Sequence, residues 1–295
     1  MRRLFLLRAY GDFVIAIRAI LNSPQPSETK IIASNHFKPL FEAIETVLDL
    51  SLLDIEFHDF GINQSQLNFF TNRHLFNSST IGQLNKIKKY LDDNIIEYAF
   101  LDGEDYVEQS SRIKAFQFFT KHRFTPIVKK SKVYNEYTLF FKPSFKEIVV
   151  KIPTDGKILI LPDARIQKRN LPQELVQEII SLSNQKNYPV QVAYFKRVSQ
   201  VNKKGKAETV QFKTDLIFSQ KVYNNFTELI NLIQASDFVI GADSLPIHLS
   251  NLLGKPHFIL YPNVVSKAFF TPFAIQYKYY SEFDKFEQDS IPFLS

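Results

Sequence analysis

The sequence contains no cysteine, no tryptophan and a single methionine among its 295 residues. Without cysteine the chain can form neither a disulfide framework nor a cysteine-ligated metal site, and it offers no thiol nucleophile. Long apolar runs are also missing: residues 13–17 and similar runs fall far short of the roughly 20 residues that a transmembrane helix needs. Charges at Arg8, Asp12 and Arg18 interrupt the apolar N-terminus, so we do not expect a secretion signal there. These absences predict a cytoplasmic protein.

Charge of one sign is not concentrated in either half of the chain. The 36 Lys and Arg residues outnumber the 30 Asp and Glu residues, which gives a formal net charge of +6. A cut after Lys146 leaves 19 basic and 16 acidic residues before it, and 17 and 14 after it, so each half carries +3. A dedicated nucleic-acid-binding protein would show a basic tail or stripe instead. We therefore expect no nucleic-acid partner.

Short apolar segments alternate with segments of helical spacing along the whole chain. In the first half we predict strands over residues 3–7, 30–33 and 95–101, a tight turn at Gly11-Asp12, and helices over residues 13–21, 38–50 and 110–120. In the second half we predict strands over residues 157–161, 190–194, 238–240 and 257–260, and helices over residues 171–182, 226–233 and 246–253. Strands that alternate with helices favour parallel α/β sheets.

The repetition of this pattern, and a length near twice that of a typical domain, predict two domains. We expect an N-terminal Rossmann-like domain over residues 1–150 and a C-terminal one over residues 151–275, with residues 276–295 packing back on the N-terminal domain. In open parallel sheets ligands bind beyond the carboxyl ends of the strands. Residues that follow the predicted strands are therefore the candidates for function.

The most informative of these candidates is the segment DSLPIH at residues 243–248, which follows the strand at 238–240. Asp243 or Ser244 can cap the helix that begins there, and the N–H groups and dipole of a helix N-terminus bind anions such as a diphosphate. His248 lies one turn into the helix, where it could donate to a phosphate oxygen. A capped helix with a histidine in the core explains the same residues equally well.

Two other segments also lie between a predicted strand and a predicted helix. Asp12 follows the first strand, where it serves either as a helix cap or as a general base for an acceptor hydroxyl. Spacing alone favours the cap. Lys168 and Arg169 follow the strand at 157–161 and could neutralise phosphate charge, although a single basic residue is more often a solvated surface charge.

Residues 112–132 are a local exception to the even distribution of charge along the chain, because they include seven basic residues and no acidic residue. Arg112, Lys114, Lys121 and Arg123 form a candidate face for an anionic membrane or an acidic glycolipid acceptor, because phenylalanines lie between them. An amphipathic helix with phenylalanine in the core and lysine outside accounts for the same pattern.

Taken in order, the three strand-to-helix segments resemble the heptosyltransferase-like glycosyltransferases of family 9. The features that carry the resemblance are the Gly-Asp pair after the first strand, KRNLP at 168–172, DSLPIHL at 243–249 and LGKP at 253–256. The resemblance implies an α/β GT-B fold, in which two Rossmann-like domains face an interdomain cleft. It also implies sugar transfer from a nucleotide diphosphate sugar, such as ADP-heptose, to a hydroxyl of a bacterial lipopolysaccharide or other surface glycan.

The same resemblance implies roles for individual residues. Asp12 would be the general base, Lys168 would contact the donor phosphate, and Asp243, Ser244 and His248 would form the donor pocket. Transfer would be inverting and independent of metal and cofactor, and the chain has no Asp-x-Asp motif. The partners would be a nucleotide-sugar donor and a lipid-linked or lipopolysaccharide acceptor. The basic stretch at residues 112–132, rather than the resemblance, suggests peripheral contact with the anionic inner face of the cytoplasmic membrane.

The sequence departs from the family pattern at three positions near the expected donor site. Leu245 replaces a glycine where the backbone approaches the phosphates, Leu171 replaces a tryptophan, and Asp163 adds a negative charge to a turn where glycine is common. Two alternatives therefore stay open. One is a non-catalytic GT-B protein that binds a glycan or nucleotide, and the other is a nucleotide-sugar epimerase.

Overall fold

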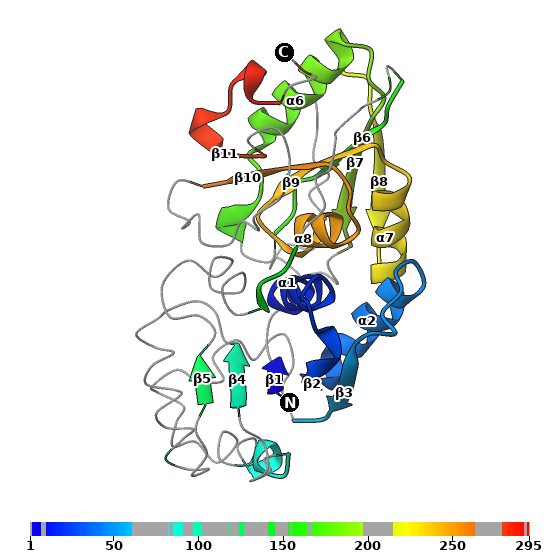
Figure 1. The fold of residues 1–295 in the computed structure, drawn as a ribbon. Helices are drawn as coiled ribbons and strands as arrows, with labels where there is room; N and C mark the ends of the chain where they lie inside the picture. The colour runs from blue at the N-terminus through cyan, green and yellow to red at the C-terminus, as the bar shows by residue number, and fades with distance from the viewer. Residues whose placement is uncertain are drawn as a thin grey trace. The chain divides into compact units, whose positions relative to one another are not determined.

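The computed structural model describes residues 2–6, 10–60, 82, 85–90, 97–101, 118, 124–126, 141–144, 153, 155–164, 167–196, 215–262, 279–291 and 294. The chain divides into two compact units (Figure 1). Unit 1 comprises Met1–Phe145 and Ser266–Phe273, and unit 2 comprises Lys146–Val265 and Ala274–Ser295. The division lies close to the boundary that the sequence predicts after residue 150.

The described part of unit 1 forms a parallel sheet with the strand order β3-β2-β1-β4-β5. Its strands are β1 (Arg2–Leu6), β2 (Thr29–Ser34), β3 (Asp54–His58), β4 (Glu97–Leu101) and β5 (Phe124–Pro126). Leu4, Phe5 and Leu6 of the central strand are all buried, although successive side chains point to opposite faces. Both faces of this sheet are therefore covered, as expected for a parallel α/β unit.

Helix α1 (Tyr10–Leu21) follows β1, and all eight residues from Phe13 to Ile20 are buried. The structure corrects the sequence prediction at its start, because Gly11 and Asp12 lie inside the first turn and not in a turn before it. Asp12 is thus not the cap residue, although its carboxylate still lies where the helix dipole favours negative charge. Helix α2 (Lys38–Glu45) is shorter than predicted and follows the 3-10 helix η2 (Asn35–Phe37). The helix predicted over residues 110–120 lies outside the described residues, apart from Phe118.

Unit 2 has a parallel sheet with the strand order β11-β10-β9-β6-β7-β8. Its strands are β6 (Ile158–Leu161), β7 (Val190–Phe195), β8 (Ser219–Tyr223), β9 (Phe238–Ala242), β10 (His257–Tyr261) and β11 (Tyr280–Glu282). Its helices are α6 (Gln173–Gln185), α7 (Phe226–Gln234) and α8 (Leu245–Leu252). The carboxyl ends of β6, β7, β8 and β9 therefore meet at one edge of the sheet.

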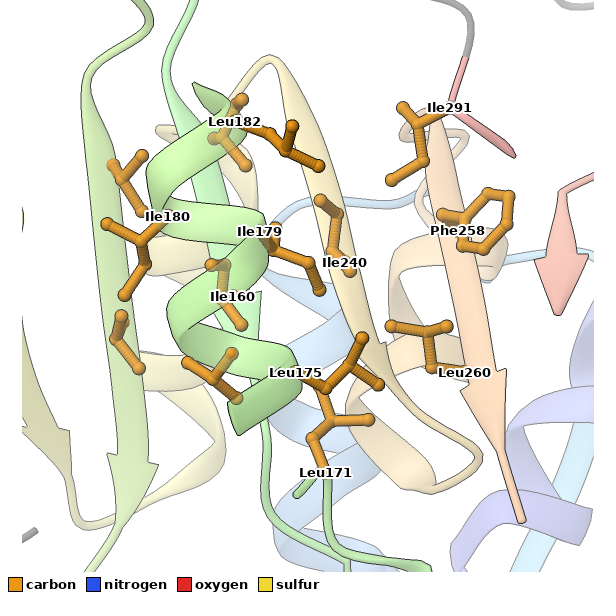
Figure 2. Packing of buried hydrophobic residues seen from close by; sticks show 14 of the residues in the cluster. Ile160, Leu171, Leu175, Ile179, Ile180, Leu182, Ile240, Phe258, Leu260 and Ile291 are labelled. Atoms are coloured by element: carbon orange, nitrogen blue, oxygen red, sulfur yellow. The ribbon is translucent and has the colours of Figure 1, made fainter. Parts of the chain in front are cut away.

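One face of this sheet and helix α6 enclose the hydrophobic core of unit 2 (Figure 2). Ile179 of α6 belongs to the same buried cluster as Ile160 of β6 and Ile240 of β9, and none of the three is exposed. The cluster extends along the sheet to Phe258 of β10. This continuous core fixes the strands whose ends carry the candidate donor residues.

The C-terminal segment packs on unit 2, so the prediction that residues 276–295 return to the N-terminal domain is wrong for their described part. Strand β11 pairs in parallel with β10, with Tyr280 opposite Ile259. Ile291 and Leu294 are fully buried in the core of unit 2. The segment thereby covers the edge of β10, which would otherwise expose unpaired backbone groups.

Three tyrosines of unit 2 are held in their protonated form by their surroundings. Burial, with the charge of Asp163 as a smaller cause, raises the pKa of both Tyr194 and Tyr223 far above its usual value. Burial and the Glu282 charge raise the pKa of Tyr261 to about 12. A raised pKa in the folded state gives a contribution to stability that is complete below about pH 10, the unfolded value, and is lost as pH rises through the folded value.

We therefore expect alkaline unfolding of unit 2 to coincide with late tyrosine ionisation. Phenolate absorbance can be followed cleanly, because the chain has 13 tyrosines and no tryptophan. Some tyrosines should ionise near pH 10 and the rest only as the far-ultraviolet circular dichroism is lost. Tyr223→Phe should move the unfolding midpoint to higher pH, because it removes a buried phenol whose ionisation favours the unfolded chain. Ionisation of all tyrosines in one step near pH 10, with the dichroism unchanged, would contradict the burial argument.

Candidate functional site

In unit 1 the carboxyl ends of β1 and β2 bring Tyr10, Asp12 and His36 to one edge of the sheet. Asp12 is half-buried in the first turn of α1. The hydroxyl of Tyr10 donates to the carbonyl oxygen of His36 at 2.9 Å, and the two rings meet edge-on with centroids 5.4 Å apart. His36 Nδ1 lies 3.1 Å from Ser34 Oγ. These contacts tie the start of α1 to the end of β2 and so fix the helix turn that carries Asp12.

Sequence reasoning missed Tyr10 and His36 as members of this edge. Both follow predicted strands, which was the available signal, but neither belongs to a motif. Burial raises the pKa of the Tyr10 hydroxyl. That hydroxyl therefore stays protonated at neutral pH and acts as a hydrogen-bond donor.

In unit 2 the start of helix α8 differs from the simple cap that the sequence predicts. Ser244 occupies the N-cap position with an extended backbone, φ −158° and ψ 175°, but its side chain makes no capping hydrogen bond. Its hydroxyl instead donates to the carbonyl oxygen of Asp163 at 3.1 Å, and lies 3.2 Å from that of Ala242. Pro246 in the first turn has no N–H group, so this helix start offers one backbone donor fewer to an anion.

Asp243 lies at the centre of a buried charged cluster with Arg169 and His248. Its Oδ2 is 3.7 Å from Arg169 Nη1, and its Oδ1 is 3.3 Å from His248 Nε2. The Asp243 side chain is only 1% exposed, and neither carboxylate oxygen accepts a hydrogen bond from the residues that the structure describes. Because a buried charge is costly unless it is paired, the Arg169 guanidinium is its compensation.

The turn after β6 connects three strand ends of unit 2. Asp163 Oδ2 accepts a hydrogen bond from the N–H of Phe195, the last residue of β7, at 3.2 Å. The carbonyl oxygen of Asp163 accepts a hydrogen bond from the hydroxyl of Ser244, which lies shortly after the end of β9. Asp163, where the family often has glycine, therefore joins the ends of β6, β7 and β9. Leu171, in place of the family tryptophan, is buried in the core of the unit.

Several predicted site residues lie beyond what the structure describes. Lys168 is in the 3-10 helix η3 (Gln167–Arg169), but the structure does not describe its side chain. The four basic residues of the candidate acceptor or membrane face are outside it altogether: Arg112, Lys114, Lys121 and Arg123. The contacts that the sequence predicts for these residues stay predictions.

The described ranges contain no group of three or more His, Asp or Glu residues arranged to hold a metal ion. Over the same ranges, every helix is too short or too polar to cross a lipid bilayer.

Comparison with known proteins gives one family match and several structural matches. The model of "Glycosyltransferase family 9 (heptosyltransferase)" matches residues 124–286. The Escherichia coli heptosyltransferase WaaC, solved with ADP, superposes with a TM-score of 0.54 at 12% identity, over 96% of this chain and 92% of that chain. A family 9 glycosyltransferase of Veillonella parvula gives 0.55 at 13% identity, over 95% and 86%. No curated protein matches the chain.

The structural matches confirm the GT-B fold that the sequence predicts, with two Rossmann-like α/β domains. Escherichia coli ADP-heptose lipopolysaccharide heptosyltransferase II adds a third match, with a TM-score of 0.51 at 11% identity, over 95% of this chain and 89% of that chain. The family model covers more than half of the residues and includes the whole of the Arg169, Asp243 and His248 cluster. The chain therefore belongs to glycosyltransferase family 9, the heptosyltransferase family, and is a heptosyltransferase-like glycosyltransferase.

Proposed function

We propose that this enzyme transfers a sugar from a nucleotide diphosphate sugar of the ADP-heptose type to a hydroxyl of a lipopolysaccharide or other surface glycan. The observation that carries the proposal is the buried cluster of Arg169, Asp243 and His248 at the start of α8. It lies at the carboxyl edge of a parallel sheet, where such folds bind ligands. A helix N-terminus beside a guanidinium and an imidazole suits a diphosphate. The presence of ADP in the structure of WaaC supports a nucleoside diphosphate.

In the proposed mechanism Asp12 takes the proton of the acceptor hydroxyl as that oxygen attacks the anomeric carbon. The bond from this carbon to the diphosphate breaks on the opposite side, so the configuration is inverted. The departing nucleoside diphosphate gains negative charge, and preorganised donors aimed at that charge lower the barrier. Lys168, His248 and the N-terminus of α8 would supply them, with Asp243 and Ser244 completing the pocket. These groups belong to the protein, so we propose transfer that needs no metal ion or cofactor.

For the acceptor, we propose a lipid-linked or lipopolysaccharide glycan that is held at the inner face of the cytoplasmic membrane. The support is the basic stretch at residues 112–132, which contains Arg112, Lys114, Lys121 and Arg123 together with several phenylalanines. Basic side chains near an anionic lipid surface contribute about 1 kcal/mol each.

A thermal-shift panel tests the proposed donor site. A ligand at about 100 times its dissociation constant stabilises a protein by about 2.7 kcal/mol, which raises the midpoint by several degrees. Among ADP, UDP, GDP and CMP we expect ADP to give this shift, with or without a divalent metal ion. His248→Ala should abolish the shift, whereas His58→Ala, a histidine substitution in unit 1, should keep it. A panel without any shift would contradict the donor site.

Leu245 favours a second candidate, a GT-B protein that binds a nucleotide without turning over a donor. Its side chain occupies the first position of α8, at the expected approach of the phosphates. This candidate predicts the thermal shift without sugar transfer. The third candidate, an epimerase, predicts conversion of the nucleotide sugar when no acceptor is present. An assay of donor consumption with and without acceptor separates all three.

A further inference from the structure

We propose that Arg169 contacts the diphosphate of the donor, and that Asp243 is a positioning residue that holds Arg169 and His248 without touching the phosphates. The inference rests on the proposed function and assigns different tasks to the charged groups of its donor site. Asp243 and a diphosphate are both anionic, so direct contact between them is repulsive. Arg169 carries the complementary charge and a planar fork of N–H donors that fits phosphate oxygens.

The burial of the three side chains supports this division. Asp243 is 1% exposed, His248 is 6% exposed and Arg169 is 19% exposed. A ligand that enters from solvent therefore reaches the guanidinium before it reaches the carboxylate. The guanidinium has five N–H donors, so one side chain can pair with Asp243 and also donate to a phosphate oxygen.

The distances in the cluster point in the same direction. The contacts of Asp243, 3.7 Å to Arg169 and 3.3 Å to His248, lack hydrogen-bond geometry. The charge of Asp243 orients the guanidinium, the imidazole lies beside its other oxygen, and neither group must break a strong hydrogen bond to Asp243 in order to meet a phosphate. Polar contacts that are long in the ligand-free site commonly tighten when the substrate binds.

The loop that carries Arg169 is fastened in place independently of its ion pair. Asn170 Oδ1 accepts a hydrogen bond from the N–H of Ala164 at 2.8 Å, and the N–H of Leu171 donates to the carbonyl of Pro162 at 2.9 Å. The Ser244 hydroxyl joins the same loop to the start of α8. Arg169 is thus held beside the start of α8, where Pro246 has no N–H group to donate. The guanidinium there adds donors that the backbone lacks.

The first test is the affinity of the full-length protein for ADP, UDP and GDP, measured by calorimetry. We expect Arg169→Gln to weaken binding of the preferred diphosphate at least tenfold. Arg169→Lys should lose less, because it keeps the charge but not the planar fork. Lys221→Gln, which removes one exposed charge of unit 2, should change affinity less than twofold. Circular dichroism should match the wild type in all three variants. The ligand-free thermal midpoint should match in Arg169→Lys and Lys221→Gln and should fall in Arg169→Gln, because that change leaves the buried Asp243 carboxylate without its cation.

The second test asks whether Asp243 acts through Arg169. In the Asp243→Asn background we expect Arg169→Gln to weaken binding less than threefold, because the guanidinium is no longer positioned there. The same tenfold loss in both backgrounds would overturn the positioning role. Wild-type affinity in Arg169→Gln would overturn the phosphate contact while the proposed function stands. Absence of binding of all three diphosphates to the wild type would overturn both.

Discussion

Asp12→Asn is expected to slow sugar transfer by about a hundredfold to ten-thousandfold, the usual contribution of a general base. Asparagine has the shape of aspartate but cannot take the acceptor proton. Nucleotide affinity should stay the same, because the cluster of Arg169, Asp243 and His248 belongs to unit 2 and Asp12 belongs to unit 1. The measurement is initial transfer rate with a nucleotide-sugar donor and a glycan acceptor, together with ADP affinity by calorimetry.

The folding of this variant can be predicted from the position of Asp12. A carboxylate in the first helical turn contributes about 0.3–1 kcal/mol through the helix dipole, so its loss should leave the chain folded. Glu28→Gln is a matched control, because Glu28 is an exposed carboxylate in the short 3-10 helix η1 (Pro26–Glu28). It should transfer sugar at the wild-type rate. Turnover of Asp12→Asn at the wild-type rate would remove Asp12 from the mechanism.

The inner strands of both sheets could be predicted from sequence, and the four edge strands could not. Inner strands such as β1, β6 and β9 are buried on both faces and read as short continuous apolar runs. Edge strands have no such run. The first four residues of β8 are exposed, and every residue of β3 is half-buried. Both remaining edge strands, β5 and β11, are only three residues long.

The positions of helix ends are harder to predict from sequence than the presence of helices, because single residues and local hydrogen bonds decide them. Glycine is typical of tight turns, yet Gly11 lies in the first turn of α1, where a missing side chain is tolerated. The apolar spacing of α2 continues to Val47 and Leu48, but the helix ends at Glu45. There the Thr46 hydroxyl donates to the carbonyl of Ala43 at 2.7 Å, one of the local hydrogen bonds that compete with helix continuation.

The residues of the candidate donor site that lie in one sequence segment can be predicted from sequence. The contacts that the fold makes between distant segments cannot. Asp243 and His248 belong to one motif, and the structure brings them within 3.3 Å of each other. The partner of the Ser244 hydroxyl is Asp163, 81 residues earlier in the chain. Arg169 likewise reaches Asp243 only because β6 and β9 are neighbours in the sheet. Periodicity and spacing carry no information on such strand neighbours.

Phe258→Ala is expected to destabilise unit 2 by about 3–5 kcal/mol, the usual cost of truncating a buried phenylalanine. Phe258 is fully buried, and its ring meets that of Phe286 edge-on with centroids 6.2 Å apart. Figure 2 shows it beside Ile291, so the truncation also opens a cavity against the C-terminal segment. Denaturant titration should show the loss, and the thermal midpoint should fall by roughly 6–20 °C.

A pair of isoleucine variants tests whether packing of the C-terminal segment stabilises this core. One isoleucine is buried in that segment, and the other is exposed in the same unit. Ile291→Ala, at a fully buried position, should cost about 2–5 kcal/mol. Ile217→Ala, at a position 78% exposed in the same unit, should stay within about 0.5 kcal/mol of the wild type. Equal small losses in Phe258→Ala and Ile291→Ala would mean that the C-terminal segment does not pack into this core. Large losses in both would establish the C-terminal segment as an element that closes the core beside β10.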